Sequence, residues 1–317
     1  MSTTVASAHR RAPQPPSTSP EERLTAELIA LMEAGVNPWR RPWDAAHRGS
    51  HRNLLSARPY SGGNPALLEL QMTLRGSDLP LWLGYAQARQ QGWFPRKGTK
   101  ACLVLRPQRH QRELLDADGQ PQRDEQGQPL TTCWISFRSA AVFNAAALQG
   151  EGLGDAIAAA LGTASPPPEP QRLARARQIL QSWPVPVVHA CDRACYIPAL
   201  DRIQLPPAGT FHSADEALAT HCHEAIHSTG ARCRLNREGI TGAHAFGSDA
   251  YAREELIAEL GAFLLTRRLA IGSNVQNHVA YLQHWSQILR QEPRMLLRLL
   301  ADATRAANLM VPEPQEG

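Results

Sequence analysis

The sequence predicts an α+β protein of two domains, an N-terminal α+β domain and a C-terminal, mostly helical domain that contains a small sheet. Three observations support this prediction. Two strand-like segments flank a polar stretch in the first half, nearly everything beyond Ser213 has helical periodicity, and a proline run separates the halves. A chain of 317 residues is long enough to form two domains, each with a buried core. The expected parts are a disordered tail at 1–19, a first domain at 20–150, a linker at 151–170 and a second domain at 171–312.

The first domain is predicted from helical spacing and turn residues. Leucines at helical spacing, followed by Gly35, predict its first helix, and Asn64-Pro65 begins the second because proline fits a first turn. The polar stretch is interpreted as a hairpin loop or an insertion. The expected elements are helices over 21–34, 64–74 and 84–91, strands over 101–105 and 131–142, and the polar loop over 107–130.

The second domain begins with a helix and three short strands and then becomes helical. Ser213 and Glu216 form a capping-box pattern at the start of one helix, and Gly230 closes that helix. Ser248 begins another helix, which ends by Gly272. The remaining expected elements are a helix over 171–183, strands over 185–189, 194–198 and 202–205, and a helical stretch over 277–309.

Composition favours a cytoplasmic protein that does not enter a membrane. No apolar run approaches the roughly 20 residues that a membrane helix needs. The first 20 residues lack the apolar stretch of a secretory signal. The six cysteines contain no C-x-x-C pair, so we expect thiols in a reducing compartment. Cys191 and Cys195 are four residues apart, but no second Cys/His pair lies nearby at metal-site spacing.

The most specific motif is His223-Glu224-Ala225-Ile226-His227, on the helix that begins after Ser213. Residues four apart lie one turn above each other, so both imidazoles can point at one ion with Glu224 beside it. Such imidazoles hold Zn²⁺, or another divalent ion such as Mn²⁺, and leave a position for water. Glu224 is the expected catalytic base that takes the proton of this water.

A third ligand is expected on the helix that begins at Ser248. We assign Glu255 as the ligand and Glu259, one turn later, as the carboxylate that hydrogen-bonds a ligand imidazole. Glu254 is the main alternative ligand. Solvated helix charges and ordinary core histidines are the non-functional alternatives. His221 and His244 are not expected to bind the ion.

The first half is basic and rich in tryptophan. Residues 1–150 hold 18 Arg and Lys against 12 Asp and Glu, whereas residues 151–317 hold 15 against 17. Cations that follow phosphates, with flat rings between them, are typical of single-strand binding. No helix has the basic face of a major-groove reader, which favours sequence-tolerant binding. The expected DNA-binding residues are Trp39, Arg40, Arg41, Arg58, Tyr60, Asn64, Arg96, Lys97 and Lys100. Trp82 and Trp134 are expected in the core.

Taken together, these motifs resemble the ArdC-type antirestriction proteins. The resemblance rests on Asn37-Pro38-Trp39, on the segment from Arg58 to Asn64, on Lys97-Gly98-Thr99-Lys100 and on the metal helix. It implies an N-terminal single-stranded-DNA-binding domain and a C-terminal zincin-like metallopeptidase domain, encoded by plasmids and other mobile elements. One departure is Ser228, where the family usually has Trp after the second histidine. We expect this exchange to widen the cleft and to alter peptide specificity.

The resulting hypothesis is a single-stranded-DNA-binding antirestriction protein of a mobile element, with a metal-binding zincin-like domain. An alternative is a zinc metallopeptidase that cleaves a host or regulatory protein, with DNA binding serving localisation. In a third interpretation the metal is structural and staples helices in a pure binding protein.

Overall fold

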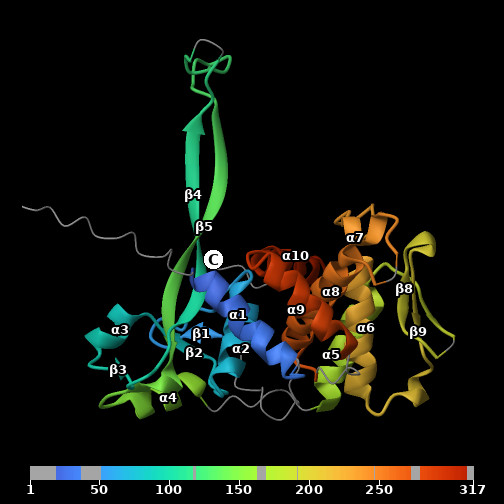
Figure 1. Cartoon of the computed structure of the whole chain (residues 1–317), viewed down its shortest axis with the longest axis horizontal. Helices are drawn as coiled ribbons and strands as arrows, with labels where there is room; N and C mark the ends of the chain where they lie inside the picture. The colour runs from blue at the N-terminus through green and yellow to red at the C-terminus, as the bar shows by residue number, and fades with distance from the viewer. Residues whose placement is uncertain are drawn as a thin grey trace, which may run out of the picture.

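The computed structural model describes residues 19–36, 51–116, 119–162, 169–190, 192–245, 247–272 and 279–312. The predicted tail before Ser19 lies outside these residues, as do Trp39, Arg40 and Arg41 of the predicted DNA-binding set. The fold class is α+β as expected, with a mixed N-terminal part and a largely helical C-terminal part (Figure 1).

The N-terminal part places helices around a small mixed sheet. Ser19 caps the first helix through a complete capping box with Glu22, which explains why the helix begins at Pro20. The sheet has the strand order β1-β2-β5-β4, and β3 pairs with β6. The elements are α1 (Pro20–Glu33), β1 (Arg52–Asn53), α2 (Asn64–Leu74), β2 (Leu81–Leu83), α3 (Tyr85–Gln90), β3 (Phe94–Pro95), β4 (Cys102–Glu113), β5 (Thr131–Asn144), β6 (Leu148–Gln149) and α4 (Leu153–Leu161).

Strands β4 and β5 are longer than predicted and form a hairpin that projects from the body (Figure 1). Their pairing runs without interruption from Cys102↔Val142 to Glu113↔Thr131. The interpretation of 107–130 as a loop is therefore wrong up to Glu113. Side chains beyond Leu105 are mostly exposed on both faces of the hairpin, so the sequence there has no apolar alternation to indicate a strand.

The predicted linker, 151–170, contains helix α4 and the start of α5. Leu153 of α4 is buried in a cluster with Leu81, Leu83 and Leu148, so α4 belongs to the N-terminal part. The closely spaced glycines from Gly150 to Gly154 concealed this helix in the sequence, because glycine usually marks a turn.

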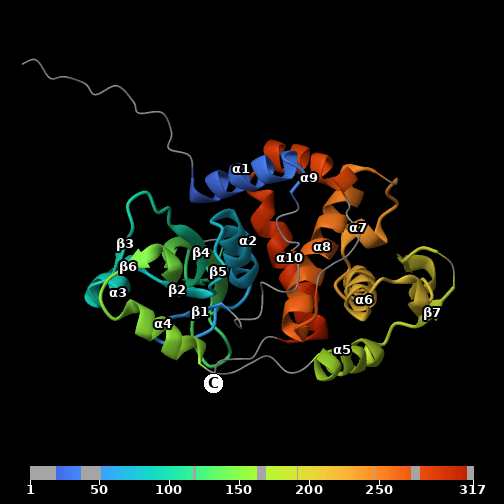
Figure 2. The ribbon, with the colours of Figure 1, turned by 90° about the horizontal axis from the view of Figure 1, so that it is seen from below.

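The C-terminal part consists of a helical layer with a three-stranded sheet beside it (Figures 1 and 2). Strand β9 is central, parallel to β7 and antiparallel to β8. Helix α6 packs on α5 and this sheet on one side and on α8 on the other. The elements are α5 (Glu169–Ser182), β7 (Val187–His189), β8 (Cys195–Ile197), β9 (Arg202–Leu205), α6 (Ala214–Ser228), α7 (Glu238–Thr241), α8 (Asp249–Leu269), α9 (Val279–Gln291) and α10 (Met295–Met310).

The two parts share one hydrophobic core. Helix α1 lies along α9 (Figure 2), and α2 contacts α8. Leu28 and Leu67 of the N-terminal part belong to the same buried cluster as Leu264 and Leu289 of the C-terminal part. Polar contacts cross the same boundary. Thr25 donates to the carbonyl of Pro293 (2.9 Å).

No helix among the described residues is long and apolar enough to cross a membrane.

Candidate metal centre

Helix α6 begins and ends near the predicted residues, with different contacts. The hydroxyl of Ser213 accepts a hydrogen bond from the backbone N–H of Glu216 (3.1 Å), as expected of an N-cap. The carboxylate of Glu216 accepts a hydrogen bond from the backbone N–H of His212 (2.7 Å), and not from that of Ser213 as a capping box requires. At the other end Thr229 is the C-cap. A Cβ on Gly230 would lie 3.0 Å from the guanidinium carbon of Arg237. The same Cβ would lie 2.6 Å from Cγ1 of Ile240, so the glycine makes room for both side chains at the end of the helix.

Helix α8 supplies the facing carboxylates. It begins at the predicted N-cap Ser248, whose hydroxyl accepts the amide of Tyr251 (3.3 Å), and it ends at Leu269, before the predicted stop at Gly272. Gly261 lies against Ile226 of α6, and a Cβ there would lie 2.7 Å from Cγ2 of the isoleucine. The two helices approach closely here, so side chains from both reach one space.

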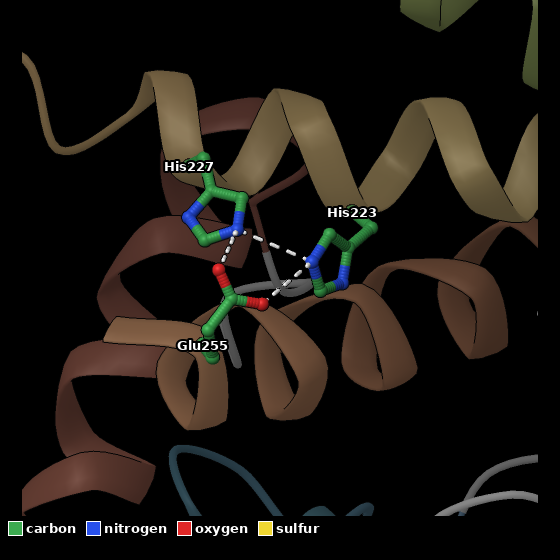
Figure 3. Close-up of side chains that lie close together, drawn as sticks. All are labelled: His223, His227 and Glu255. Atoms are coloured by element: carbon green, nitrogen blue, oxygen red, sulfur yellow. Dashed lines mark hydrogen bonds and ion pairs between the residues drawn. The ribbon is translucent and has the colours of Figure 1, made fainter. Parts of the chain in front are cut away.

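The structure brings His223, His227 and Glu255 together between α6 and α8 (Figure 3). The two Nε2 atoms are 3.2 Å apart. The carboxylate of Glu255 lies 3.7 Å from Nε2 of His223 and 3.5 Å from Nε2 of His227. Two ligands at about 2.0–2.1 Å from a tetrahedral ion lie about 3.3 Å apart, so these separations and this donor set fit a zinc-like divalent ion.

Carboxylates on the outer side of the imidazoles hold both rings. Nδ1 of His223 lies 3.4 Å from Glu259, the residue predicted for this contact. Nδ1 of His227 lies 3.3 Å from Glu254. Glu254, the alternative ligand predicted from the sequence, therefore contacts the side of the His227 ring that faces away from His223 and Glu255. Such contacts orient the ring and leave Nε2 free to face an ion.

Two further residues complete this arrangement and were missed in the sequence. Arg237, buried after α6, donates to both carboxylate oxygens of Glu254 (3.0 and 2.6 Å) and to the carbonyl of Ile226 (2.9 Å). Tyr251, one turn before Glu255, hydrogen-bonds its carboxylate. In the sequence, the i, i+4 spacing of Tyr251 and Glu255 is the one signal of a contact between them. The contact of Arg237 has no such signal, because its partner Glu254 is 17 residues away in the chain.

The charges of the centre are strongly coupled. Burial opposes protonation of His223, but hydrogen bonds to Glu255 and Glu259 and the charge of Glu224 raise its pKa well above the ordinary value. Burial would raise the pKa of Glu255, yet the charges of the two histidines hold it at about 2. The pKa of Glu254 is lowered despite burial, through His227 and Arg237. Glu254 and Glu255 are therefore ionised, and Glu255 is the one that faces the Nε2 atoms of the two histidines.

Glu224, His221 and His244 are not among the three converging side chains. Glu224 is buried on α6 beside His223, close enough for its charge to act on that ring. His221 lies in a pocket of about 810 Å³ lined also by Trp183 and Phe211, and burial lowers its pKa to about 4. His244 is exposed, within hydrogen-bond distance of the carbonyl of Glu238. The structure places neither histidine with the three converging side chains.

Ser228 does not widen a cleft. It is fully buried, its hydroxyl donates to the carbonyl of Ala225 (2.6 Å), and it accepts a hydrogen bond from the indole of Trp183 (2.9 Å). The expectation of a wider cleft at this position is therefore wrong, because the side chain points into the packing between α6 and the end of α5.

Several residues predicted to bind DNA lie on the surface of the N-terminal part. Arg58, Arg96, Lys97 and Lys100 are exposed. Arg96 donates to the carbonyl of Ala146 (3.0 Å), and Lys100 forms an ion pair with Glu27 (3.2 Å).

Tyr60 and Asn64 are more enclosed. Tyr60 is partly buried against the cluster that contains Val104 and Val142. The side-chain amide of Asn64 donates a hydrogen bond to the backbone carbonyl of Leu105 (2.9 Å) and accepts one from the backbone N–H of Leu105 (2.7 Å). This reciprocal pairing supports a structural role for Asn64, and a DNA contact by its side chain stays a prediction.

Of the two tryptophans predicted to lie in the core, the structure buries one and exposes the other. Trp82 is fully buried as expected, and its indole donates to Nδ1 of His51 (3.0 Å). Trp134 was also expected in the core, and this is wrong, since it is 47% exposed and stacks on His110. It lies on the projecting part of the hairpin, where none of the other elements that the structure describes covers it.

Two protein families match separate parts of this chain. The family described as the N-terminal domain of anti-restriction factor ArdC matches residues 19–143, and the family described as zincin-like metallopeptidase matches residues 174–302. The chain is also similar to crystal structures of the antirestriction protein ArdC from plasmid R388. The metal-free structure has a TM-score of 0.65 and 30% identity, and the Mn(II)-bound structure has 0.63 and 28%. In both cases the match covers 92% of this chain and 96% of the other.

Similar curated proteins include longer ones. The chain is 33% and 32% identical to two proteins named DNA primase TraC from Escherichia coli, matching over 90% and 92% of its own length. It spans only 19% and 27% of those relatives. It is also 30% identical to the uncharacterized protein y4eC of Sinorhizobium fredii, over 95% of this chain and 94% of that protein.

Proposed function

Because the chain belongs to the ArdC-type antirestriction family, we propose that it protects DNA of a mobile element by binding single strands, while its zincin-like domain holds a divalent metal ion. Two structural observations support the two halves of this proposal. Exposed cations lie on the N-terminal part, and two imidazoles and a carboxylate converge in the C-terminal part. We place the division between the domains between α4 and α5. The free thiols favour a cytoplasmic site of action.

The metal proposal is carried by the convergence of His223, His227 and Glu255 on one point. These three residues would hold Zn²⁺, with Mn²⁺ as the other candidate. When bound, such an ion acts as a Lewis acid and lowers the pKa of a water molecule beside it. Glu259 and Glu254 keep the ligand rings oriented, and Arg237 keeps Glu254 in place.

The second candidate function is peptide hydrolysis, and one observation favours it. Glu224 is a buried carboxylate next to a ligand histidine, where a purely structural site would not need one. Its carboxylate would accept the proton of the attacking water and later donate it to the leaving amine. The substrate would be a host or regulatory protein, with DNA binding serving localisation.

Glu224→Gln separates the two candidates. The variant should keep its metal content, measured by elemental analysis, because Glu224 is not among the converging ligands. If DNA binding confers protection, the variant should still protect incoming DNA from restriction in transfer assays. Loss of protection with unchanged DNA affinity would instead assign the function to hydrolysis. Glu238→Gln, at an exposed glutamate on the neighbouring α7, is the matched control.

Single-strand binding is tested by fluorescence anisotropy with labelled single-stranded and duplex oligonucleotides, with and without chelator. Affinity for single strands should fall steeply with salt, and Lys97→Ala should reduce the slope of log affinity against log salt by about 0.7. Arg253→Ala, at an exposed arginine of α8, should leave the slope unchanged. Equal affinity for duplex, or a flat salt response, would contradict the proposal.

A further inference from the structure

We propose that one face of the projecting β4–β5 hairpin is a binding surface for single-stranded nucleic acid. The hairpin arm is defined as Arg106 to Glu113 of β4 together with Thr131 to Arg138 of β5 (Figure 1). The proposal rests on the single-strand binding proposed above. It adds a surface that the sequence does not predict, because the sequence indicates a loop over its outer part and a core position for Trp134.

The strand register divides the arm into two different faces. Directly paired residues of an antiparallel ladder point to the same side, and alternate pairs point to opposite sides. The first side is called the arginine face and consists of the pairs Arg106↔Arg138, Gln108↔Ser136, His110↔Trp134 and Arg112↔Thr132. The opposite face carries the pairs Pro107↔Phe137, Gln111↔Cys133 and Glu113↔Thr131, together with Arg109.

Charge distinguishes the two faces. The arginine face carries three exposed arginines, at 106, 112 and 138, and no acidic residue. None of the three forms an ion pair with another residue that the structure describes. Arg106 and Arg138 are direct cross-strand partners, so two like charges are held side by side. Such pairs repel each other unless an anion lies between them, and a phosphate backbone supplies this anion.

An aromatic platform lies between these arginines along the same face. The rings of His110 and Trp134 stack with centroids 5.3 Å apart and planes 14° from parallel. Nε2 of His110 lies within hydrogen-bond distance of the Ser136 hydroxyl (2.6 Å), which fixes the ring. Trp134 remains 47% exposed. A flat ring held in place beside cations suits stacking of a base, because every base has a π-face.

The arginine face continues into the N-terminal part. The inner pairs of the same side are Cys102↔Val142 and Val104↔Ala140, and Tyr60 packs against the cluster that contains them. Arg106 is close enough for its charge to act on the Tyr60 hydroxyl. Arg58, which the sequence predicted to bind DNA, lies two residues before this tyrosine and is exposed. A single strand could therefore run from Arg58 and Tyr60 outward along the arm over Trp134.

Matched variants on the two faces test this inference. Arg106→Ala and Arg109→Ala remove the same charge from neighbouring positions of one strand, on opposite faces. We expect Arg106→Ala to weaken binding of a fluorescein-labelled polythymidine strand and to lower the salt slope by about 0.7, with less than a twofold effect for Arg109→Ala. Trp134→Ala should weaken binding about five- to a hundredfold, and Trp134→Phe should retain most of the affinity.

The outcomes separate this proposal from the proposed function. If the unmodified protein does not bind single strands, the proposed function itself fails. If it binds, and Lys97→Ala weakens binding while Arg106→Ala and Trp134→Ala do not, only the hairpin surface is overturned. Equal effects of Arg106→Ala and Arg109→Ala would overturn the assignment to one face. If Trp134→Ala changes the oligomeric state but not DNA affinity, the arm is a protein-contact surface. Unchanged metal content and circular dichroism show that each variant is folded.

Discussion

The protonation state of His223 should make metal binding at the proposed site depend on pH. In the metal-free protein, hydrogen bonds to Glu255 and Glu259 raise the pKa of this ring well above the unfolded value of 6.5, although burial opposes the shift. A raised pKa stabilises the metal-free fold fully below about pH 6.5, and this contribution is lost as the pH rises through the folded pKa. Because a metal ligand must be neutral imidazole, an arriving ion has to displace the proton.

We therefore predict that the apparent affinity for Mn²⁺ or Zn²⁺ rises with pH, by about tenfold per unit for each proton displaced, until the pH passes the raised pKa. Calorimetric titrations in two buffers of different ionisation enthalpy count the protons released. Glu259→Gln removes one cause of the raised pKa, so its affinity should level off at a lower pH. A pH-independent affinity for the unmodified protein would contradict this account.

Individual site residues were predictable where one helix holds them. His223 and His227 lie one turn apart, so the motif places both rings on one side without knowledge of the fold. The choice between Glu254 and Glu255 is different. Adjacent helical residues differ by about 100° in direction, and only the crossing of α8 over α6 decides which one faces the rings. That decision depends on contacts distant in the chain, such as Arg237 with Glu254.

At the scale of elements, the closeness of α6 and α8 depends on Gly261. A Cβ there would lie 2.7 Å from Cγ2 and 3.2 Å from Cδ1 of Ile226, a fully buried side chain. Alanine favours an isolated helix over glycine by up to about 1 kcal/mol. Overpacking of a core by one methyl costs about 1–3 kcal/mol. The contact should therefore outweigh the gain in helix propensity.

Gly261→Ala should accordingly lower the free energy of unfolding by up to about 2 kcal/mol and weaken metal binding, because the helices that carry the proposed ligands move apart. Urea unfolding and metal titration measure the two effects. Gly154→Ala, in α4, is the matched control, since a Cβ there meets nothing within 4 Å. This control should be neutral or stabilising. A stabilising Gly261→Ala would show that the interface has room to spare.

Elements were predictable when one of their faces is buried. The helices near 21–34 and 64–74 were found because their leucines recur at helical spacing. The outer half of β4 was not found, since its residues face solvent on both sides and carry no periodic apolar signal. Trp134 was misplaced for the same reason. A tryptophan in a strand is usually covered, but this hairpin extends beyond the layers that would cover it.

At the scale of the molecule, the two parts are joined through a buried charge. Glu69 of α2 is 2% exposed, lies 2.9 Å from Nε2 of His51 and pairs with Arg267 of α8. This network lies beside the core that α1 and α2 share with the C-terminal helices. No local sequence pattern predicts this contact, because Glu69 and Arg267 are 198 residues apart in the chain. The sequence could predict two domains, but not that they bury a common core.

Arg267→Ala should lower the stability of the whole protein by about 3 kcal/mol, the lower end of the range for a broken buried pair, because His51 still contacts Glu69. Tryptophan fluorescence and far-UV circular dichroism should show one coincident transition, shifted to lower urea. Arg298→Ala, which removes an exposed partner of Glu292, should change stability by less than about 1 kcal/mol. Two separate transitions in the unmodified protein would contradict the shared core.

The contacts of Arg237 have a consequence for the proposed metal site. One guanidinium joins Glu254 of α8, the hydroxyl of Thr229 and the last carbonyls of α6. The imidazole and carboxylate positions are therefore set by the polypeptide before any cation arrives. Chelation should empty the centre without melting the helices around it. We therefore expect the occupancy of the proposed metal site to follow the supply of divalent ions, with the fold retained when the site is empty.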